Sequence, residues 1–168
     1  KTAPRLALRQ VLAQQIDPRS IIWNNMPSRE GIWVDQTETV EFLSSGSAFS
    51  SGEPVEVVET HGAYVFLCGD TALKLKRGVT YDYMDLSTVE LRQRMIAREL
   101  ELNRPRAPEI YRDMLPITRT RYGLALGGDG PVVDWVLRMW RFPAEHELEA
   151  IAQRGGFNDR LADATGKE

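Results

Sequence analysis

The stretch AYVFLCGDTALKLK, residues 63–76, decides the fold of this chain, because it predicts two short strands joined by a tight turn. β-Branched and aromatic side chains favour strands, and Gly69-Asp70 is typical of a two-residue hairpin loop. Such a loop sets the register, since residues that face each other across a hairpin lie on the same side of the sheet. The expected facing pairs are Cys68 with Thr71, Phe66 with Leu73 and Tyr64 with Leu75.

Alternation along the two strands places a second set of side chains on the opposite face. This set consists of Val65, Leu67, Ala72, Lys74 and Lys76. Two lysines thus stand at the end of a small apolar floor, which would suit a flat heterocycle that carries a polyphosphate. The alternative is a solvated face, on which the lysines only discourage pairing between sheet edges.

The segments around this hairpin complete an α+β fold. VEVVET, residues 55–60, precedes it as a strand, and a long helix follows from the capping box at Ser87-Thr-Val-Glu90 to about Arg104. We expect a five-stranded, mostly antiparallel sheet with this one long helix after the third strand, preceded by short N-terminal helices. The remaining expected elements are helices at 5–16, at 36–45 after an N-cap at Asp35, and at 145–154, and strands at 109–118 and 132–142.

Glu99 stands out on the long helix, because its neighbours three and four positions away belong to the apolar stripe. These neighbours are Met95, Ile96, Leu102 and Asn103. A carboxylate on a buried stripe costs several kcal/mol unless it is paired. We expect Lys74 as its partner; the alternative is a local pair with Arg92 or Arg98.

The turn THGA, residues 60–63, joins the first two expected strands. Gly62 allows a close backbone approach, and the amide groups here would face a phosphate, as in glycine-containing phosphate loops. His61 would donate a hydrogen bond to the same phosphate. The alternative is a solvated loop histidine without a ligand.

Composition excludes several classes of protein. The 168 residues carry a net charge of −3, and the longest apolar runs, such as residues 64–68, are far shorter than the roughly 20 residues that cross a bilayer. Cys68 is the one cysteine, which excludes an internal disulfide and a multi-thiolate zinc site, so we expect a cytoplasmic protein without metal ligands of its own. Basic residues are dilute even in residues 1–29, so neither nucleic acid nor a membrane is expected as a partner.

Four stretches together resemble a known family. They are VETHGAYVFLCGDTALKLKRGV (58–79), YMDLSTVELRQRMIARELELNR (83–104), APEIYRDMLPIT (107–118) and LALGGDGPVVDWVLRMWRFP (124–143). In combination they are similar to the N-terminal lobe of bacterial aminoglycoside-phosphotransferase-like proteins, which have the protein-kinase-like fold. The resemblance covers about residues 35–156 and is closest to the branch in which the kinase-like part precedes a P-loop ATPase part.

The resemblance implies roles for individual residues. Lys74 would contact the α- and β-phosphates of ATP and pair with Glu99, while Val65 and Ala72 would cover the adenine. Lys76 is the rival for the phosphate role, and the A-x-K spacing favours Lys74. Residues 139–142 would form the hinge whose backbone binds the adenine edge. The expected nucleotide-binding residues are therefore His61, Gly62, Val65, Ala72, Lys74, Lys76, Met139, Trp140 and Arg141, with Lys74 and Glu99 as the catalytic pair.

The sequence also departs from the family. Neither His61 nor His146 begins an H-x-D catalytic loop, and no Walker motif is present. We therefore expect an extension at 1–34, the kinase-like lobe at 35–143, and at 144–168 the exit from the hinge and the start of a catalytic lobe that this chain lacks.

The functional expectation follows from this division. It is the ATP-binding lobe of a small-molecule phosphotransferase with an unknown acceptor, inactive by itself, with Mg²⁺ expected only with the C-terminal lobe and a P-loop domain possible in the parent protein. The alternative is a non-catalytic nucleotide-binding or protein-interaction module that has the shape of a kinase lobe.

Overall fold

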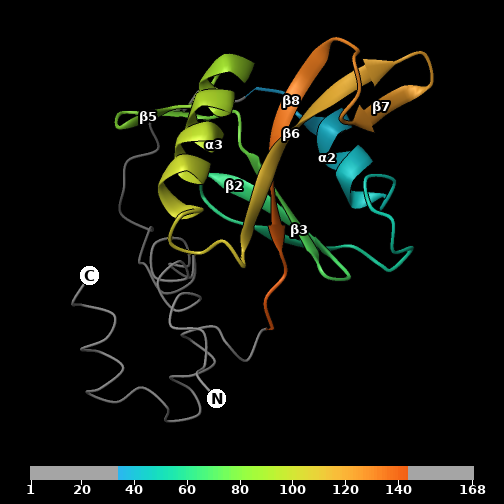
Figure 1. The fold of residues 1–168 in the computed structure, drawn as a ribbon. Helices are drawn as coiled ribbons and strands as arrows, with labels where there is room; N and C mark the ends of the chain where they lie inside the picture. The colour runs from blue at the N-terminus through green and yellow to red at the C-terminus, as the bar shows by residue number, and fades with distance from the viewer. Residues whose placement is uncertain (1–33, 144–168) are drawn as a thin grey trace, which may run out of the picture. The chain divides into compact units, whose positions relative to one another are not determined.

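The structure is a computed structural model and describes residues 34–143. These residues form an α+β fold, as the sequence predicts (Figure 1). The elements in chain order are α2 (Thr37–Ser44), β1 (Glu56–Glu59), β2 (Ala63–Cys68), β3 (Thr71–Lys76), β4 (Thr80–Tyr81), β5 (Met84–Asp85), α3 (Val89–Asn103), β6 (Tyr111–Thr120), β7 (Gly123–Leu126) and β8 (Val132–Trp140). The helices expected at 5–16 and 145–154, and the segments 1–33 and 144–168 as a whole, lie outside the described residues.

The main sheet has six strands in the order β1-β2-β3-β8-β6-β7, and each neighbouring pair is antiparallel. The register of the β2–β3 hairpin agrees with the prediction, because Cys68 pairs with Thr71, and the pairs further along follow from it. The expected count of five strands is wrong. β7 is the extra strand; it pairs with the end of β6 across a turn at residues 121–122, and its first residue, Gly123, has a φ of 125°, which an L-amino acid rarely adopts.

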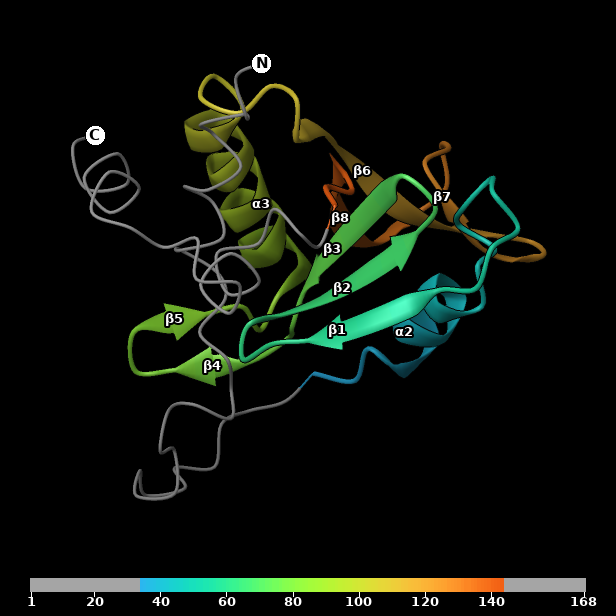
Figure 2. The same ribbon diagram turned by 90° about the horizontal axis from the view of Figure 1, so that it is seen from below.

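A second small element also escaped the prediction. β4 and β5 form a two-stranded ribbon between β3 and α3. Figure 2 shows this ribbon beside the turn that joins β1 and β2. Each of its strands is two residues long, too short for a period-2 pattern to appear in the sequence.

The two helices lie on opposite faces of the sheet (Figure 1). Leu43 of α2 packs into the main core against side chains of β2 and β3 such as Phe66 and Leu75. Successive residues of a strand point to opposite faces, so Lys74, next to Leu75, points away from α2 and meets α3. Burial of each large core side chain contributes about 1.5–3 kcal/mol, and this apolar layer holds the strands that present Lys74.

The start of α3 differs by one residue from the expected capping box. Thr88 is the N-cap, and its hydroxyl accepts a hydrogen bond of 3.3 Å from the Leu91 N–H. The Ser87 N–H instead donates to Asp85 Oδ1 at 2.9 Å. α2 shows the same offset, because Gln36 occupies its N-cap position while Asp35 accepts from the Thr37 N–H just before the helix.

A buried polar network fixes α3 to the sheet. Arg92 lies against Asp134 of β8, with Nε 2.9 and 3.1 Å from the two carboxylate oxygens and both side chains at most 3% exposed. Gln36 donates to the same carboxylate at 2.8 Å and to the Lys76 carbonyl at 3.0 Å. We call Gln36, Arg92 and Asp134 the helix clamp. The clamp joins four parts of the chain: the segment before α2, the last residue of β3, strand β8 and helix α3. It therefore determines where the rest of α3 lies.

Among the described residues, no helix is long and apolar enough to cross a membrane.

Candidate functional site

Lys74 and Lys76 of β3 share one carboxylate, Glu99 of α3. Lys74 Nζ lies 2.9 Å from Glu99 Oε1, and Lys76 Nζ lies 2.7 Å from Glu99 Oε2. The side chain of Lys74 is 7% exposed, that of Lys76 is 14% exposed, and that of Glu99 is 9% exposed. We call them the Lys–Glu–Lys cluster. The expected pairing of Lys74 with Glu99 is confirmed, although the sequence did not predict that Lys76 would take the second oxygen.

The local alternatives for Glu99 are wrong. Arg92 is occupied by Asp134, and Arg98 pairs with Glu101 at 2.7 Å on the exposed side of α3. An exposed pair of this kind contributes little stability, because water screens both charges.

The inner face of α3 is more polar than expected. Its inward positions are Arg92, Ile96, Glu99 and Asn103, whereas Met95 and Leu102 are 38% and 43% exposed. Glu99 is therefore inside, as predicted, together with Ile96 and Asn103, but Met95 and Leu102 do not belong to the inner face. The spacing of three and four residues from Arg92 to Asn103 is the signal that identifies the true inner face.

The cluster brings two ammonium groups to one carboxylate at a largely buried position. Burial lowers the pKa of the Lys74 ammonium, and repulsion from Lys76 lowers it further. Attraction to Glu99 raises it, but not enough, so the pKa falls to about 8. Burial raises the pKa of the Glu99 carboxyl, but the two ammonium groups outweigh burial and lower it to about 2. Both lysines thus stabilise the charged form of Glu99, whereas the burial of Lys74 outweighs its attraction to Glu99.

An apolar floor adjoins the cluster on the same face of the sheet. The register places its side chains in two rows that cross β1, β2, β3 and β8. The first row is Glu56, Leu67, Ala72 and Met139, and the second is Val58, Val65, Lys74 and Leu137. The expected set of Val65, Leu67, Ala72, Lys74 and Lys76 does share this face, which is confirmed by the β2–β3 register. The β8 residues were not predicted for the floor, because their places depend on long-range pairing; Met139 was expected only at the hinge. The β1 residues were also missed, although β1 pairs with the neighbouring strand β2.

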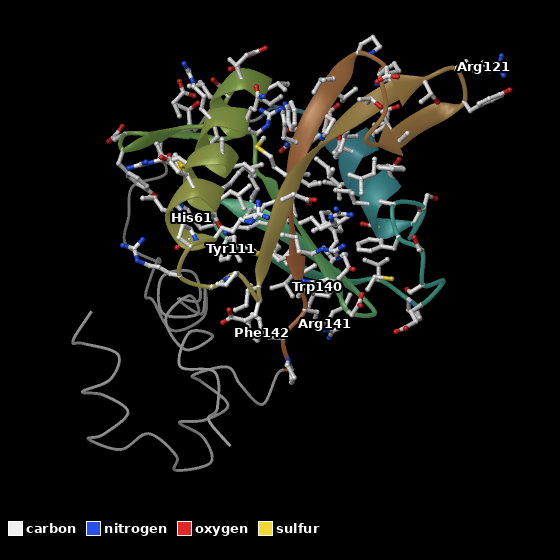
Figure 3. The ribbon with its side chains drawn as sticks, viewed as in Figure 1. His61, Tyr111, Arg121, Trp140, Arg141 and Phe142 are labelled. Carbon is white, nitrogen blue, oxygen red and sulfur yellow. The ribbon has the colours of Figure 1, made fainter. Side chains whose placement is uncertain are left out.

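The expected hinge residues lie at the end of β8, where Figure 3 labels Trp140, Arg141 and Phe142. The Trp140 N–H donates to the Ile110 carbonyl at 2.8 Å, and the Arg141 N–H donates to the Asp70 carbonyl at 2.7 Å. These two donors are already used within the sheet, so a contact to an adenine edge would have to come from another backbone group of residues 139–142.

The side chains of this segment point in different directions. Trp140 pairs with Thr71, one position away from the floor, and its ring stacks under the Arg112 guanidinium at 3.8 Å. Trp140 therefore does not line the floor. Arg141 reaches Glu56 of the first row at 2.8 Å, which places an exposed ion pair at the edge of the floor.

The β1–β2 turn packs on the β4–β5 ribbon. The His61 ring stacks on Tyr81 with centroids 4.4 Å apart, and its Nε2 lies 2.6 Å from the Tyr83 hydroxyl. Burial and the nearby Arg77 lower the pKa of His61. A β-carbon on Gly62 would lie 3.4 Å from the Met84 side chain. The structure therefore gives the His61 ring aromatic partners in this ribbon while the residue stays exposed; neither the phosphate prediction nor the solvated alternative anticipated these partners.

The described residues do not form a metal-binding site. Within residues 34–143, no group of three or more His, Cys, Asp or Glu side chains is placed to hold a metal ion. The described residues thus do not fit the Mg²⁺ that the resemblance implies for the complete protein.

A hollow of about 280 Å³ lies elsewhere, on the face that α2 covers. Its lining includes Gln36, Val40, Tyr64 and Arg77, and it contains no member of the Lys–Glu–Lys cluster. The cluster itself lies between β3 and α3 and is largely buried.

Comparison with known proteins adds relatives but no activity. No protein-family model matches the chain, and no solved structure matches it. Similar proteins are Uncharacterized protein Mb2027c of Mycobacterium bovis and Uncharacterized proteins MT2060 and Rv2004c of Mycobacterium tuberculosis, each 36% identical over 111 residues. The match covers 59% of this chain and 21% of each relative, so the chain spans about a fifth of their length.

Proposed function

We propose that this chain supplies the nucleotide-binding lobe of a small-molecule phosphotransferase. One observation carries the proposal: a strand lysine and a helix glutamate form a buried ion pair, 2.9 Å long, beside an apolar floor. A pair of this kind holds the lysine ammonium where it can meet the phosphates of a nucleotide whose base rests on the floor.

The charge of the site supports an anionic ligand. The cluster places two ammonium groups side by side, and they are buried enough that water screens them poorly. A lysine ammonium has three donors, and the bond from Lys74 to Glu99 uses one of them.

The floor supports a flat, apolar group next to that anion. Ala72 is the small residue of the first row, and it lies between Leu67 and Met139 on the neighbouring strands. A small side chain at this position lets a ring approach the backbone of β3, one row away from Lys74.

The proposal divides the work between this chain and the rest of the protein. The described residues bind and orient; they offer no catalytic aspartate on an H-x-D loop and no magnesium ligands. Phosphoryl transfer, choice of the acceptor and the metal site are assigned to the C-terminal lobe, and a P-loop domain is a further expected neighbour in the parent protein.

Calorimetric titration of the full-length protein with ATP and ADP tests the proposal. We expect saturable binding below millimolar ligand, and loss of most of the affinity in Lys74→Ala. Glu101→Gln is the matched control on α3, because its exposed pair lies away from the cluster. Absence of binding at millimolar ATP and ADP would refute the proposed function, whereas binding without transfer to any acceptor would favour a non-catalytic nucleotide module.

A further inference from the structure

β7 is an edge strand that lacks the usual protection against pairing with another strand. It ends the six-stranded sheet, and within residues 34–143 its one strand neighbour is β6. An exposed edge presents a row of backbone N–H and C=O groups to any further strand, and proteins commonly block such an edge with charged residues or proline. β7 has neither, because its sequence is Gly-Leu-Ala-Leu.

The hydrogen bonds between β6 and β7 show which backbone groups of β7 point outward. The Gly127 N–H, just after β7, donates to a β6 carbonyl at 2.7 Å. Facing residues of an antiparallel pair are bonded to each other at every second position, so Ala125 is also bonded to β6. The N–H and C=O groups of Leu124 and Leu126 therefore point away from β6, at the edge of the sheet.

We propose that β7 is a self-association surface, on which a second copy of this chain adds its own β7 as an antiparallel strand. A two-fold axis through Ala125 relates the two strands, so that Leu124 of each copy faces Leu126 of the other. The outward N–H and C=O groups of these leucines then bond to each other across the axis. The sheet runs continuously through both copies.

The sequence around Ala125 is complementary to itself when the strand direction is reversed. Residues 121–129 read RYGLALGGD, with Ala125 at the centre. The two-fold axis therefore brings Arg121, in the turn before β7, to the same end as Asp129 of the second copy. Both side chains are exposed, and Figure 3 shows Arg121 at the outer end of the β6–β7 hairpin. Opposite charges that meet across paired strands stabilise the pairing and fix its register.

Small residues at the axis let the two backbones approach each other. Ala125 would face its own copy at a position that exchanges no hydrogen bonds, where the Cα atoms come as close as about 4.5 Å. Gly123 would face Gly127 of the second copy, so no side chain obstructs the ends of the pair. Leu124 and Leu126 already pack against the main core, and the pairing would extend this apolar layer from one copy to the other.

The other edge of the sheet, β1, is not suited to pairing with itself. Its sequence is Glu-Val-Val-Glu, so an antiparallel second copy would place Glu56 opposite Glu59. Each of these carboxylates already binds an arginine of its own chain. The self-pairing of β1 would thus bring like charges together and gain no new ion pair. The difference between the two edges favours β7 as the edge that meets a second copy.

Self-association through β7 leaves the candidate site free. Strands β8 and β6 separate β7 from β3 in the sheet, and Figure 1 shows β7 at the rim, away from α3. The two-fold axis is perpendicular to the sheet, so the Lys–Glu–Lys clusters of both copies would lie on the same face. The dimer is therefore expected with or without a nucleotide.

Sedimentation velocity of the full-length protein tests this surface. We expect a concentration-dependent equilibrium between monomer and dimer over about 1–100 µM protein. Ala125→Lys places two ammonium groups at the axis and should weaken dimerisation about ten-fold or more. Ala97→Lys is the matched control, because it adds the same charge at an exposed alanine of α3, and it should leave the equilibrium unchanged.

A charge exchange separates the loss of a contact from the loss of the fold. Arg121→Asp and Asp129→Arg each bring like charges together in the dimer and should weaken it. The double variant restores the opposite charges and should dimerise within about two-fold of the original protein. Melting temperatures at a concentration where every form is monomeric should agree, since both side chains are exposed.

Three outcomes would overturn the proposal. A protein that stays monomeric at about 100 µM does not use β7 for self-association. A dimer that Ala125→Lys and Ala97→Lys affect equally forms through another surface. If the single charge changes weaken the dimer and the double variant does not restore it, Arg121 does not meet Asp129 and the two-fold register is wrong.

Discussion

Replacement of Glu99 by glutamine is the perturbation for which the structure gives the clearest magnitude. The substitution preserves the shape of the side chain and removes its charge, so two buried ammonium groups lose the one carboxylate between them. Removing one partner of a buried ion pair costs about 3–5 kcal/mol, because the remaining charge stays desolvated. Here two charges of the same sign remain.

The pKa of Glu99 gives a second value for the stability that its negative charge contributes. A fall from 4.5 to about 2 means that the folded state favours the ionised carboxyl by about 3 kcal/mol. A carboxyl whose pKa is lowered by folding stabilises the protein above its unfolded pKa, and this contribution is lost as the pH falls through the folded value. The contribution of Glu99 is therefore present at pH 5–8 and disappears between about pH 4.5 and pH 2.

Denaturant unfolding at a series of pH values measures both effects. At pH 7 we expect Glu99→Gln to lower the free energy of unfolding by about 3 kcal/mol, and Glu101→Gln by less than about 0.5 kcal/mol, since Glu101 is 69% exposed. The difference between the two variants narrows below pH 4.5, where the original carboxyl begins to take up its proton. Equal stabilities of the two variants at pH 7, or a difference that does not change with pH, would refute the assignment of Glu99 as the buried counter-charge.

Other predictions concern the helix clamp, a close backbone approach and the titration of the cluster. Arg92→Met leaves the buried carboxylate of Asp134 without its cation, so we expect the free energy of unfolding to fall by about 3 kcal/mol. Arg94→Met is the control; this arginine is exposed, and its replacement should leave the stability nearly unchanged. Equal effects of the two substitutions would contradict the role given to the helix clamp. Gly130→Ala brings a β-carbon into collision with the Arg119 backbone oxygen, so the chain must shift there, and we expect a loss of roughly 1–3 kcal/mol in the free energy of unfolding. Full stability of this variant would show that the approach is looser than described. The affinity for ATP should fall as the pH rises through about 8, where Lys74 loses its proton; an affinity that stays constant to pH 10 would exclude Lys74 as the phosphate-binding ammonium.

Local rules predicted the parts of this fold that depend on neighbours in the sequence. The Gly69-Asp70 turn set the hairpin register, and strand alternation then placed Lys74 and Lys76 on one face. Helical spacing placed Glu99 inward and Glu101 outward, which agrees with their exposures of 9% and 69%. The pairing of Lys74 with Glu99 followed from the cost of a buried, unpaired carboxylate.

The parts that were missed depend on contacts between distant segments. The helix clamp joins Gln36 to Asp134, 98 positions apart, and no periodicity within either segment reveals such a contact. An aspartate within the apolar run VVDWVL of β8 was the available signal, because a charged residue inside a buried strand needs a partner. The same rule that identified the need of Glu99 for a cation, applied to Asp134, would have pointed to Arg92.

The β4–β5 ribbon shows a different limit of sequence reasoning. Its two-residue strands pair locally, but the ribbon matters because Tyr81 and Tyr83 meet His61 on a turn about twenty positions earlier. A histidine in a glycine-containing turn was interpreted as a phosphate donor, since nothing in the sequence shows which aromatic rings will lie beside it.

Chemical labelling with an acyl phosphate of ATP tests whether the lysines of β3 lie beside a bound nucleotide. The lysine amine attacks the acyl carbonyl, an amide forms, and ATP leaves, so the label marks the lysines beside the bound phosphates. Near pH 8 about half of Lys74 is unprotonated and able to react. The account predicts acylation of Lys74 or Lys76 that excess ATP blocks, with little label on Lys1 and Lys167. Labelling that excess ATP does not reduce, or that spreads evenly over the four lysines of this chain, would contradict it.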